Sequence, residues 1–177
     1  SMIFVNTNLA AAGGVMGALI LSKIMFGKSD LTMALNGAIG GLVSITAEPL
    51  APTPGLALMI GFIGGIIVVI SIVMLDKMRI DDPVGAISAH GTCGIWGLLA
   101  VTITGGSLGA QVYGIIMIFL WTFITSLIFW TLIKMFIGLR VTEEQETDGV
   151  DISECGLEAY PEFSKAAGIK PSVYPEQ

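Results

Sequence analysis

The chain has 177 residues, of which 54% are hydrophobic and only 12% are charged. A soluble domain normally carries about a quarter charged residues, so too few charges remain here to cover a surface that faces water. The 14 acidic side chains outnumber the 8 basic ones, so no excess of Lys and Arg is present to neutralise phosphates, which argues against nucleic acid as a partner. The composition predicts a protein that lies mostly in lipid.

The charges divide the chain into two parts. Residues 1–138 hold five acids and five bases, whereas residues 139–177 hold nine acids and three bases. We therefore expect a transmembrane body over 1–138 and an acidic C-terminal tail outside the membrane over 139–177.

Five apolar stretches of the body are long enough to be membrane helices, which need about 17 to 25 residues. The second stretch is short and rich in small residues, so it could be a buried or tilted helix. Glycines four residues apart recur in the first three stretches and predict close packing into an all-α, polytopic transmembrane helix bundle. In chain order the stretches are 2–22, 31–47, 55–75, 83–104 and 110–137.

The basic residues predict the orientation in the membrane. Lys and Arg occur after the first, third and fifth stretches, and none lies in the gaps after the second and fourth. By the positive-inside rule, the basic gaps and the tail are cytoplasmic and the N-terminus of this chain faces outside. The first stretch lacks a charged region before it and is interpreted as a span, not a signal peptide. Because Ser1 is not an initiator residue, we expect further sequence before it.

The only histidine, His90, lies in the fourth stretch, about 12 Å beyond Asp82 along a helix. An ionisable group this deep in a bilayer is costly and marks a functional site by default. A neutral imidazole offers one donor and one acceptor, so His90 could bind a small polar hydride or could simply join two helices.

Cys93 shares the helix face of His90, but no further metal ligand or catalytic partner accompanies the pair. No enzyme, metal site or cofactor is predicted.

Two further features concern helix ends. Asp82 and Pro83 are interpreted as the start of the fourth helix, with Asp82 as the cap and Pro83 at the first helical position. Asn36 and Thr46 lie near the two ends of the second stretch and could line a pore or join helices by hydrogen bonds.

Four ordered motifs resemble the ammonium transporter (Amt/Mep/Rh) family. Three lie in the body and one in the tail, so the resemblance extends over nearly the whole chain. They are Phe4-Val5-Asn6-Thr7, the run from Asn36 to Val43, Asp81-Asp82-Pro83 with His90-Gly91 and Gly94-Ile95, and the run from Gly138 to Asp151 that continues to Glu158-Ala159-Tyr160-Pro161.

This resemblance implies an architecture. The five stretches would be the last five of about eleven family helices, namely the second inverted repeat without its first helix, followed by a final long helix. The family assembles as a homotrimer in the plasma membrane, with one pore in each subunit. His90 matches the second of two mid-pore histidines, and its partner lies outside this chain.

The resemblance also implies roles for other residues. Asn36 would lie at the cytoplasmic vestibule, Ile39 and Ala86 on the apolar pore wall, and Thr46 near the outer end. The tail would be regulatory, packing under a neighbouring subunit, with a PII-type signalling protein as a possible partner. Its candidate residues are Arg140, Gly149, Asp151, Ser153, a plausible phosphorylation site, and Tyr160.

The sequence departs from the family pattern at three places. Gly85 stands where some members have an acidic residue near the inner pore mouth, Glu48-Pro49 replaces a more usual turn, and Cys155 stands where many members have histidine. The first departure weakens an inner cation site, and the third concerns regulation.

The predicted function is transport of ammonium or ammonia through a hydrophobic pore with a mid-pore histidine, serving nitrogen uptake. One alternative is a sensory module of the same family that signals through its tail and carries little flux. The other is a channel for a different small neutral solute.

Overall fold

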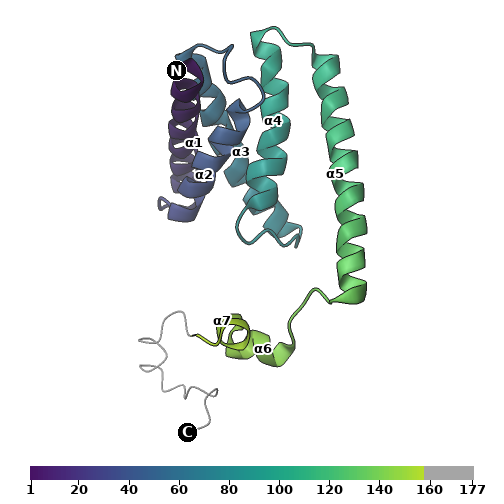
Figure 1. Cartoon of the computed structure of the whole chain (residues 1–177). Helices are drawn as coiled ribbons and strands as arrows, with labels where there is room; N and C mark the ends of the chain where they lie inside the picture. The colour runs from purple at the N-terminus through teal and green to yellow at the C-terminus, as the bar shows by residue number, and fades with distance from the viewer. Residues whose placement is uncertain (158–177) are drawn as a thin grey trace. The chain divides into compact units, whose positions relative to one another are not determined.

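The computed structural model describes residues 1–157, and every regular element in them is helical (Figure 1). The all-α prediction is therefore confirmed. The elements are α1 (Met2–Phe26), α2 (Leu31–Ile45), α3 (Pro54–Lys77), the π-helix η1 (Ile87–Thr92), α4 (Cys93–Ala100), the 3-10 helix η2 (Val101–Thr104), α5 (Leu108–Phe136), α6 (Glu143–Asp148) and α7 (Val150–Cys155).

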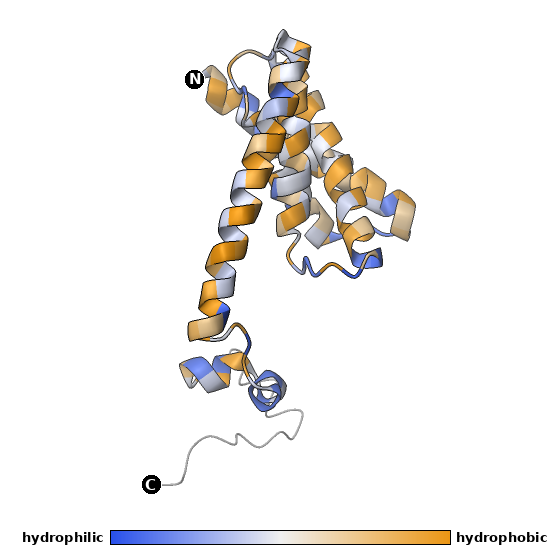
Figure 2. Ribbon diagram, turned by 90° about the vertical axis from the view of Figure 1, so that its right-hand side faces the viewer, coloured by the Kyte–Doolittle hydropathy of each residue, from blue (hydrophilic) through white to orange (hydrophobic). Residues whose placement is uncertain are grey.

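The chain forms two compact units, Ser1–Trp121 and Thr122–Gln177. In the part that the structure describes, four helical segments are long and apolar enough to cross a membrane: α1, α3, the continuous segment Ile87–Thr104, and α5. The apolar α2 is shorter, with 15 residues. Figure 2 shows apolar residues along these helices, in contrast to the polar α6 and α7. This is a multi-pass membrane protein.

Local signals in the sequence explain where the first helices begin and end. Helix α1 runs past the predicted end at residue 22 until Gly27, whose left-handed φ of 74° lets its N–H donate to the Lys23 carbonyl. Helix α2 begins after Asp30, whose carboxylate accepts a hydrogen bond from the Met33 N–H at 3.0 Å. The Thr32 hydroxyl and the Met33 N–H lower the pKa of Asp30.

Helices α1, α2 and α3 pack against one another through main-chain atoms, and α4 packs on α2 and α3 (Figure 1). A Cβ atom added to Gly61 would lie 2.0 Å from the Ala10 carbonyl oxygen, and one added to Gly65 would lie 2.0 Å from the Gly14 oxygen. A Cβ atom added to Gly14 would likewise lie 2.0 Å from the Gly37 carbonyl oxygen. The glycines with four-residue spacing therefore mark real helix contacts, as the pattern predicts.

The fourth span begins later than the prediction of residue 83. Pro83 lies in a turn closed by the Gly85 N–H, which donates to the Asp82 carbonyl at 3.0 Å, and is not the first helical residue. Gly85 has a φ of 73°, a conformation that favours glycine and interrupts a right-handed helix. Helical residues start at Ala86, so the Asp-Pro pair precedes the helix by a full turn.

Asn6 fixes the loop between α2 and α3. Its side chain is fully buried, and its Nδ2 donates to the carbonyls of Pro49 at 3.0 Å and Pro52 at 2.8 Å. Proline-rich loops offer carbonyls but few N–H donors, so a buried amide is a suitable partner for this turn.

Replacing Asn6 by alanine should lower the free energy of unfolding by about 1 to 3 kcal/mol, because two carbonyls lose their donor in a buried site. The matched control is Asn8→Ala, since the exposed Asn8 donates only to Phe4 of its own helix. Thermal unfolding of the purified complete protein measures both. Equal midpoints for the two variants would show that the Asn6 contacts do not stabilise the loop.

In the second unit, the polar segment after α5 forms two short helices. Thr142 caps α6 in a capping box with Gln145, in which each side chain bonds to the other residue's backbone N–H. Gly149, with a φ of 107°, separates α6 from α7. The positive φ explains why glycine stands at this junction.

Candidate functional site

His90 lies in η1, within a segment long enough to cross a membrane. Its side chain is exposed, and its ring makes no hydrogen bond or ion pair with any residue in 1–157. The interpretation of His90 as a joint between two helices of this chain is therefore not supported by the described residues. No described residue engages either ring nitrogen, so both remain able to form hydrogen bonds.

The residues next to His90 are held from the neighbouring helix α3. The hydroxyls of Thr92 and Ser71 are 2.8 Å apart, and the Cys93 thiol, which is fully buried, donates to the Gly64 carbonyl at 3.4 Å. Cys93 is therefore a buried packing residue, and its thiol is not accessible to a substrate. Among residues 1–157, no group of three or more His, Cys, Asp or Glu could hold a metal ion.

Asp82 holds the start of η1. Its carboxylate accepts from the Ile87 N–H at 2.9 Å, the Ser88 N–H at 3.1 Å and the Ser88 hydroxyl at 3.0 Å. Partial burial by itself raises the pKa of this carboxyl, but the hydrogen bonds together outweigh burial and hold the pKa below its ordinary value. Asp82 therefore stays charged at neutral pH and satisfies amides that no helical carbonyl reaches.

Asn36 lies directly against the turn that precedes η1. A Cβ atom on Gly85 would lie 2.6 Å from the Asn36 Oδ1, so only glycine fits at position 85. The Asn36 Nδ2 donates to the Thr32 carbonyl at 3.1 Å, and its Oδ1 is buried without a partner among the described residues. Ala86, which follows Gly85 and directly precedes η1, is exposed. Asn36 and Ala86, two of the predicted pore residues, therefore lie in one region, where α2 packs against η1.

The other two predicted pore residues lie farther along α2. Ile39 is exposed to 39%. Thr46 is exposed at the C-terminal end of α2, where its hydroxyl donates to the Leu42 carbonyl at 2.7 Å. Thr46 thus lies at the opposite end of α2 from Asn36.

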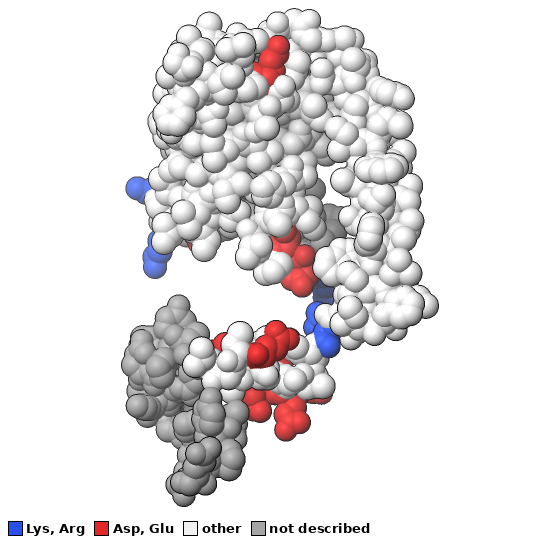
Figure 3. Space-filling model, in the orientation of Figure 1, with Lys and Arg blue, Asp and Glu red and all other residues white. Residues whose placement is uncertain are grey.

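Charges are sparse at the Thr46 end of the first unit. Glu48, which accepts a hydrogen bond from the Thr104 hydroxyl, is the only charged side chain there. The basic residues of this unit and its other acids lie at the opposite end, at 23–30 and 76–82, in the last turns of α1 and α3 and in the loops that follow them. Figure 3 shows the same separation, with a lone acidic patch at one end of the bundle and both acidic and basic atoms at the other.

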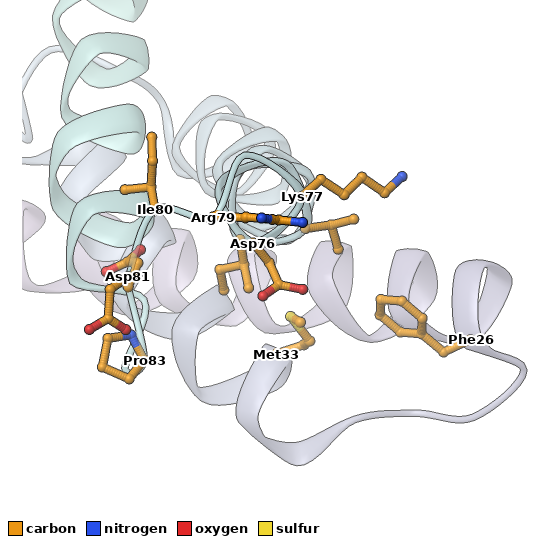
Figure 4. A pocket seen from close by; sticks show the side chains of 11 residues that line it. Phe26, Met33, Asp76, Lys77, Arg79, Ile80, Asp81 and Pro83 are labelled. Carbon is orange, nitrogen blue, oxygen red and sulfur yellow. The ribbon is translucent and has the colours of Figure 1, made fainter. Parts of the chain in front are cut away.

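A cavity of about 700 Å³ opens at the end where the basic residues lie (Figure 4). Phe26, Met33 and Asp76 line it from three different helices, and Asp82 and Pro83 close it beside η1. Figure 4 shows Asp76 and Met33 facing the same space, with the Lys77 side chain extended away from it. His90 and the other predicted pore residues do not line this cavity.

The predicted regulatory residues lie in the second unit. Arg140 is exposed after α5, Gly149 joins α6 to α7, Asp151 lies in the first turn of α7, and the exposed Ser153 hydroxyl donates to the Val150 carbonyl at 3.4 Å. Tyr160 falls outside the described residues.

Sequence reasoning missed Ser71 and Thr92. Both are hydroxyl residues in apolar helices, and such a group must find a hydrogen-bond partner inside the bundle. That rule could have singled them out, but it could not have paired them.

Comparison with known protein families identifies the family of this chain. A model of the Ammonium Transporter Family matches residues 1–160. The chain belongs to this family. Its members are transporters and not enzymes, in agreement with the prediction from the sequence.

Individual ammonium transporters and a solved structure show the same relationship. The chain is 38% identical to ammonium transporter Amt2 of Archaeoglobus fulgidus, with 92% of this chain and 40% of that protein covered. It is 33% identical to the ammonium transporter of Bacillus subtilis, covering 89% of this chain and 43% of the relative. A solved sensor Amt protein is 34% identical, with a TM-score of 0.81, covering 86% of this chain and 41% of that one. The chain thus spans about two fifths of the length of these relatives.

Proposed function

We propose that this chain forms part of a pore that conducts ammonium nitrogen across the plasma membrane into the cell, with His90 as the hydrogen-bond partner of the permeating molecule. The observation that carries the proposal is the position of His90. It is the only histidine of the chain, it lies in a membrane-length segment, and its ring is exposed and unbonded among the described residues.

The energetics favour deprotonation before passage. A bare cation on a dry, apolar path pays a large desolvation penalty, so ammonium gives up its proton before the narrow section. A neutral imidazole can accept a hydrogen bond from ammonia and donate one to it. Ile39 and Ala86 form the apolar wall in this proposal, while Asn36 and Thr46 supply polar groups near the two ends.

The distribution of charge supports an orientation. Lys23, Lys28, Lys77 and Arg79 lie at the end of the first unit opposite Glu48. By the positive-inside rule that end is cytoplasmic, the chain's N-terminus is outside and the tail is inside. Within the complete protein, the body serves as the second inverted repeat with a final long helix.

The tail and the assembly complete the proposal. Three identical complete subunits form a homotrimer with one pore each, and residues 139–177 regulate conduction by packing under a neighbour. Exposed Arg140 and Ser153 and the turn at Gly149 present polar groups for that contact or for a PII-type signalling protein.

Replacing His90 by alanine in the complete transporter should reduce uptake of labelled methylammonium by about 2- to 12-fold, the effect expected when a neutral permeating molecule loses one hydrogen bond. Uptake into proteoliposomes, with the current recorded in parallel, measures the effect. Lys28→Gln, in the exposed loop between α1 and α2, is the control and should leave uptake unchanged. Normal uptake and current in the His90→Ala variant would overturn the role of His90.

A sensory module is the second candidate, favoured by the likeness to the solved sensor Amt protein. A sensor would bind ammonium and alter the tail while accumulating little methylammonium. The same uptake experiment on the unmodified complete protein separates the two, since a conducting pore accumulates the labelled substrate and a pure sensor does not.

A further inference from the structure

The π-helix η1 is the only one in residues 1–157, and it contains His90. The Cys93 N–H donates to the Ser88 carbonyl, five residues earlier, as well as to the His90 carbonyl. Such i→i+5 turns are rare inside helices and are frequent at functional sites. Here the turn changes which side chains face the neighbouring helices.

The burial pattern shows that change directly. Helix α4 buries Cys93, Gly97 and Ala100, the spacing of one face of an α-helix. Continued backward at the same pitch, that face would include Ala89 and His90. The structure instead buries Ser88 and Ala89, whereas His90 is exposed. The additional residue in the π turn has rotated the imidazole off the face that packs on α2 and α3.

Both ends of η1 are held by side chains. Asp82 binds the N–H groups of Ile87 and Ser88 at the first end. At the other end Thr92, the last π-helical residue, shares a hydrogen bond of 2.8 Å with Ser71 of α3, which is 6% exposed. Ser and Thr side chains form such hydrogen bonds across membrane helices, and this one joins the end of η1 to a defined point on α3.

We propose that Ser71 and Thr92 are positioning residues for His90: their hydroxyl pair holds the π turn that keeps the imidazole out of the helix interface. The significance of this for conduction rests on the proposed function. The orientation of the His90 side chain can be tested without a transport assay.

The test uses two reporter cysteines in the solubilised complete transporter, with Cys155→Ser as background. His90→Cys reports the side chain that the π turn exposes, and Ser88→Cys reports one that it buries. N-ethylmaleimide labelling rates are measured with and without Thr92→Val. The reporter at 90 should label quickly and the reporter at 88 slowly. Thr92→Val should speed labelling at 88 by a factor of about 2 to 12, the shift that one hydrogen bond causes in an equilibrium.

The matched control is Thr92→Ser, which keeps the hydroxyl and should leave both rates unchanged. Ser71→Ala should act like Thr92→Val, because either change removes the same pair. Equal labelling at 88 and 90 in the parent background, or no change at 88 in Thr92→Val, would overturn the proposal.

A second readout links orientation to flux. With His90 present, Thr92→Val should slow methylammonium uptake by a similar factor, and Thr92→Ser should restore it. Normal uptake in Thr92→Val would show that the hydroxyl pair does not position His90 for conduction. If the unmodified protein accumulates no substrate, the conducting function fails, and the labelling rates alone decide the orientation.

Discussion

Replacing Gly61 by alanine is expected to prevent the body of the protein from folding correctly. The new Cβ would lie 2.0 Å from the Ala10 carbonyl oxygen and 2.5 Å from the Ala10 Cα, and both are main-chain atoms that cannot rotate away. Helices α1 and α3 would have to separate along their contact. We expect a loss of about 3 kcal/mol or more, the upper range for overpacked cores.

The measurement is the yield and thermal midpoint of the purified complete protein, followed by size-exclusion chromatography. Gly55→Ala is the control, because it lies in the same helix and a Cβ there meets nothing within 4 Å. If Gly61→Ala were as stable as Gly55→Ala, α1 and α3 would not meet through their backbones in the folded protein.

Replacing Asp82 by alanine should cost about 2 kcal/mol, because the N–H groups of Ile87 and Ser88 lose their acceptor in a partly buried site. The Ser88 hydroxyl loses the same partner. We expect the π turn to fray from its first end, which should be visible as faster hydrogen exchange of the amides in Ile87–Thr92.

The same carboxylate predicts a pH dependence. Its folded-state pKa lies below its ordinary value of 3.8, so its stabilisation is complete above that value and is lost as pH falls through the folded-state pKa. Asp82→Asn keeps one acceptor but cannot titrate. Thermal midpoints of the parent and Asp82→Asn should therefore converge in strong acid, and a gap that stays constant with pH would contradict this assignment.

Much of the fold could be predicted from the sequence, because apolar runs of membrane length have few alternatives in lipid. The glycine pairs around Gly13, Gly37 and Gly61 also indicated close helix contacts, since their four-residue spacing places them on one face. The positions of the helix ends were harder to predict. At Gly27 a left-handed glycine decides the end, and the charged Lys23 before it lies inside the helix.

The start of the fourth span could not be predicted correctly. Asp82-Pro83 has the composition of a helix start, but the positive φ of Gly85 and its contact with Asn36 place the helix later. The same region contains the π turn. Because that turn depends on the Ser71–Thr92 pair, whose members lie on different helices, no local pattern indicates it.

The three glycines of the fourth span, Gly91, Gly94 and Gly97, do not make equivalent contacts. Gly97 packs against Ser44, where an added Cβ would lie 2.9 Å from the carbonyl oxygen. Added Cβ atoms on Gly91 and Gly94 would meet only side-chain atoms, at 3.8 and 3.9 Å.

The main-chain contacts between α1 and its neighbours limit how the body can move. Helices usually slide in small steps because interlocking side chains shift between rotamers. Gly14 touches the backbone of Gly37 on one side and of Gly65 on the other, so no deformable layer separates these three helices. We therefore expect α1, α2 and α3 to behave as one stiff block, and any opening or closing of the protein to be confined to the segments attached to that block.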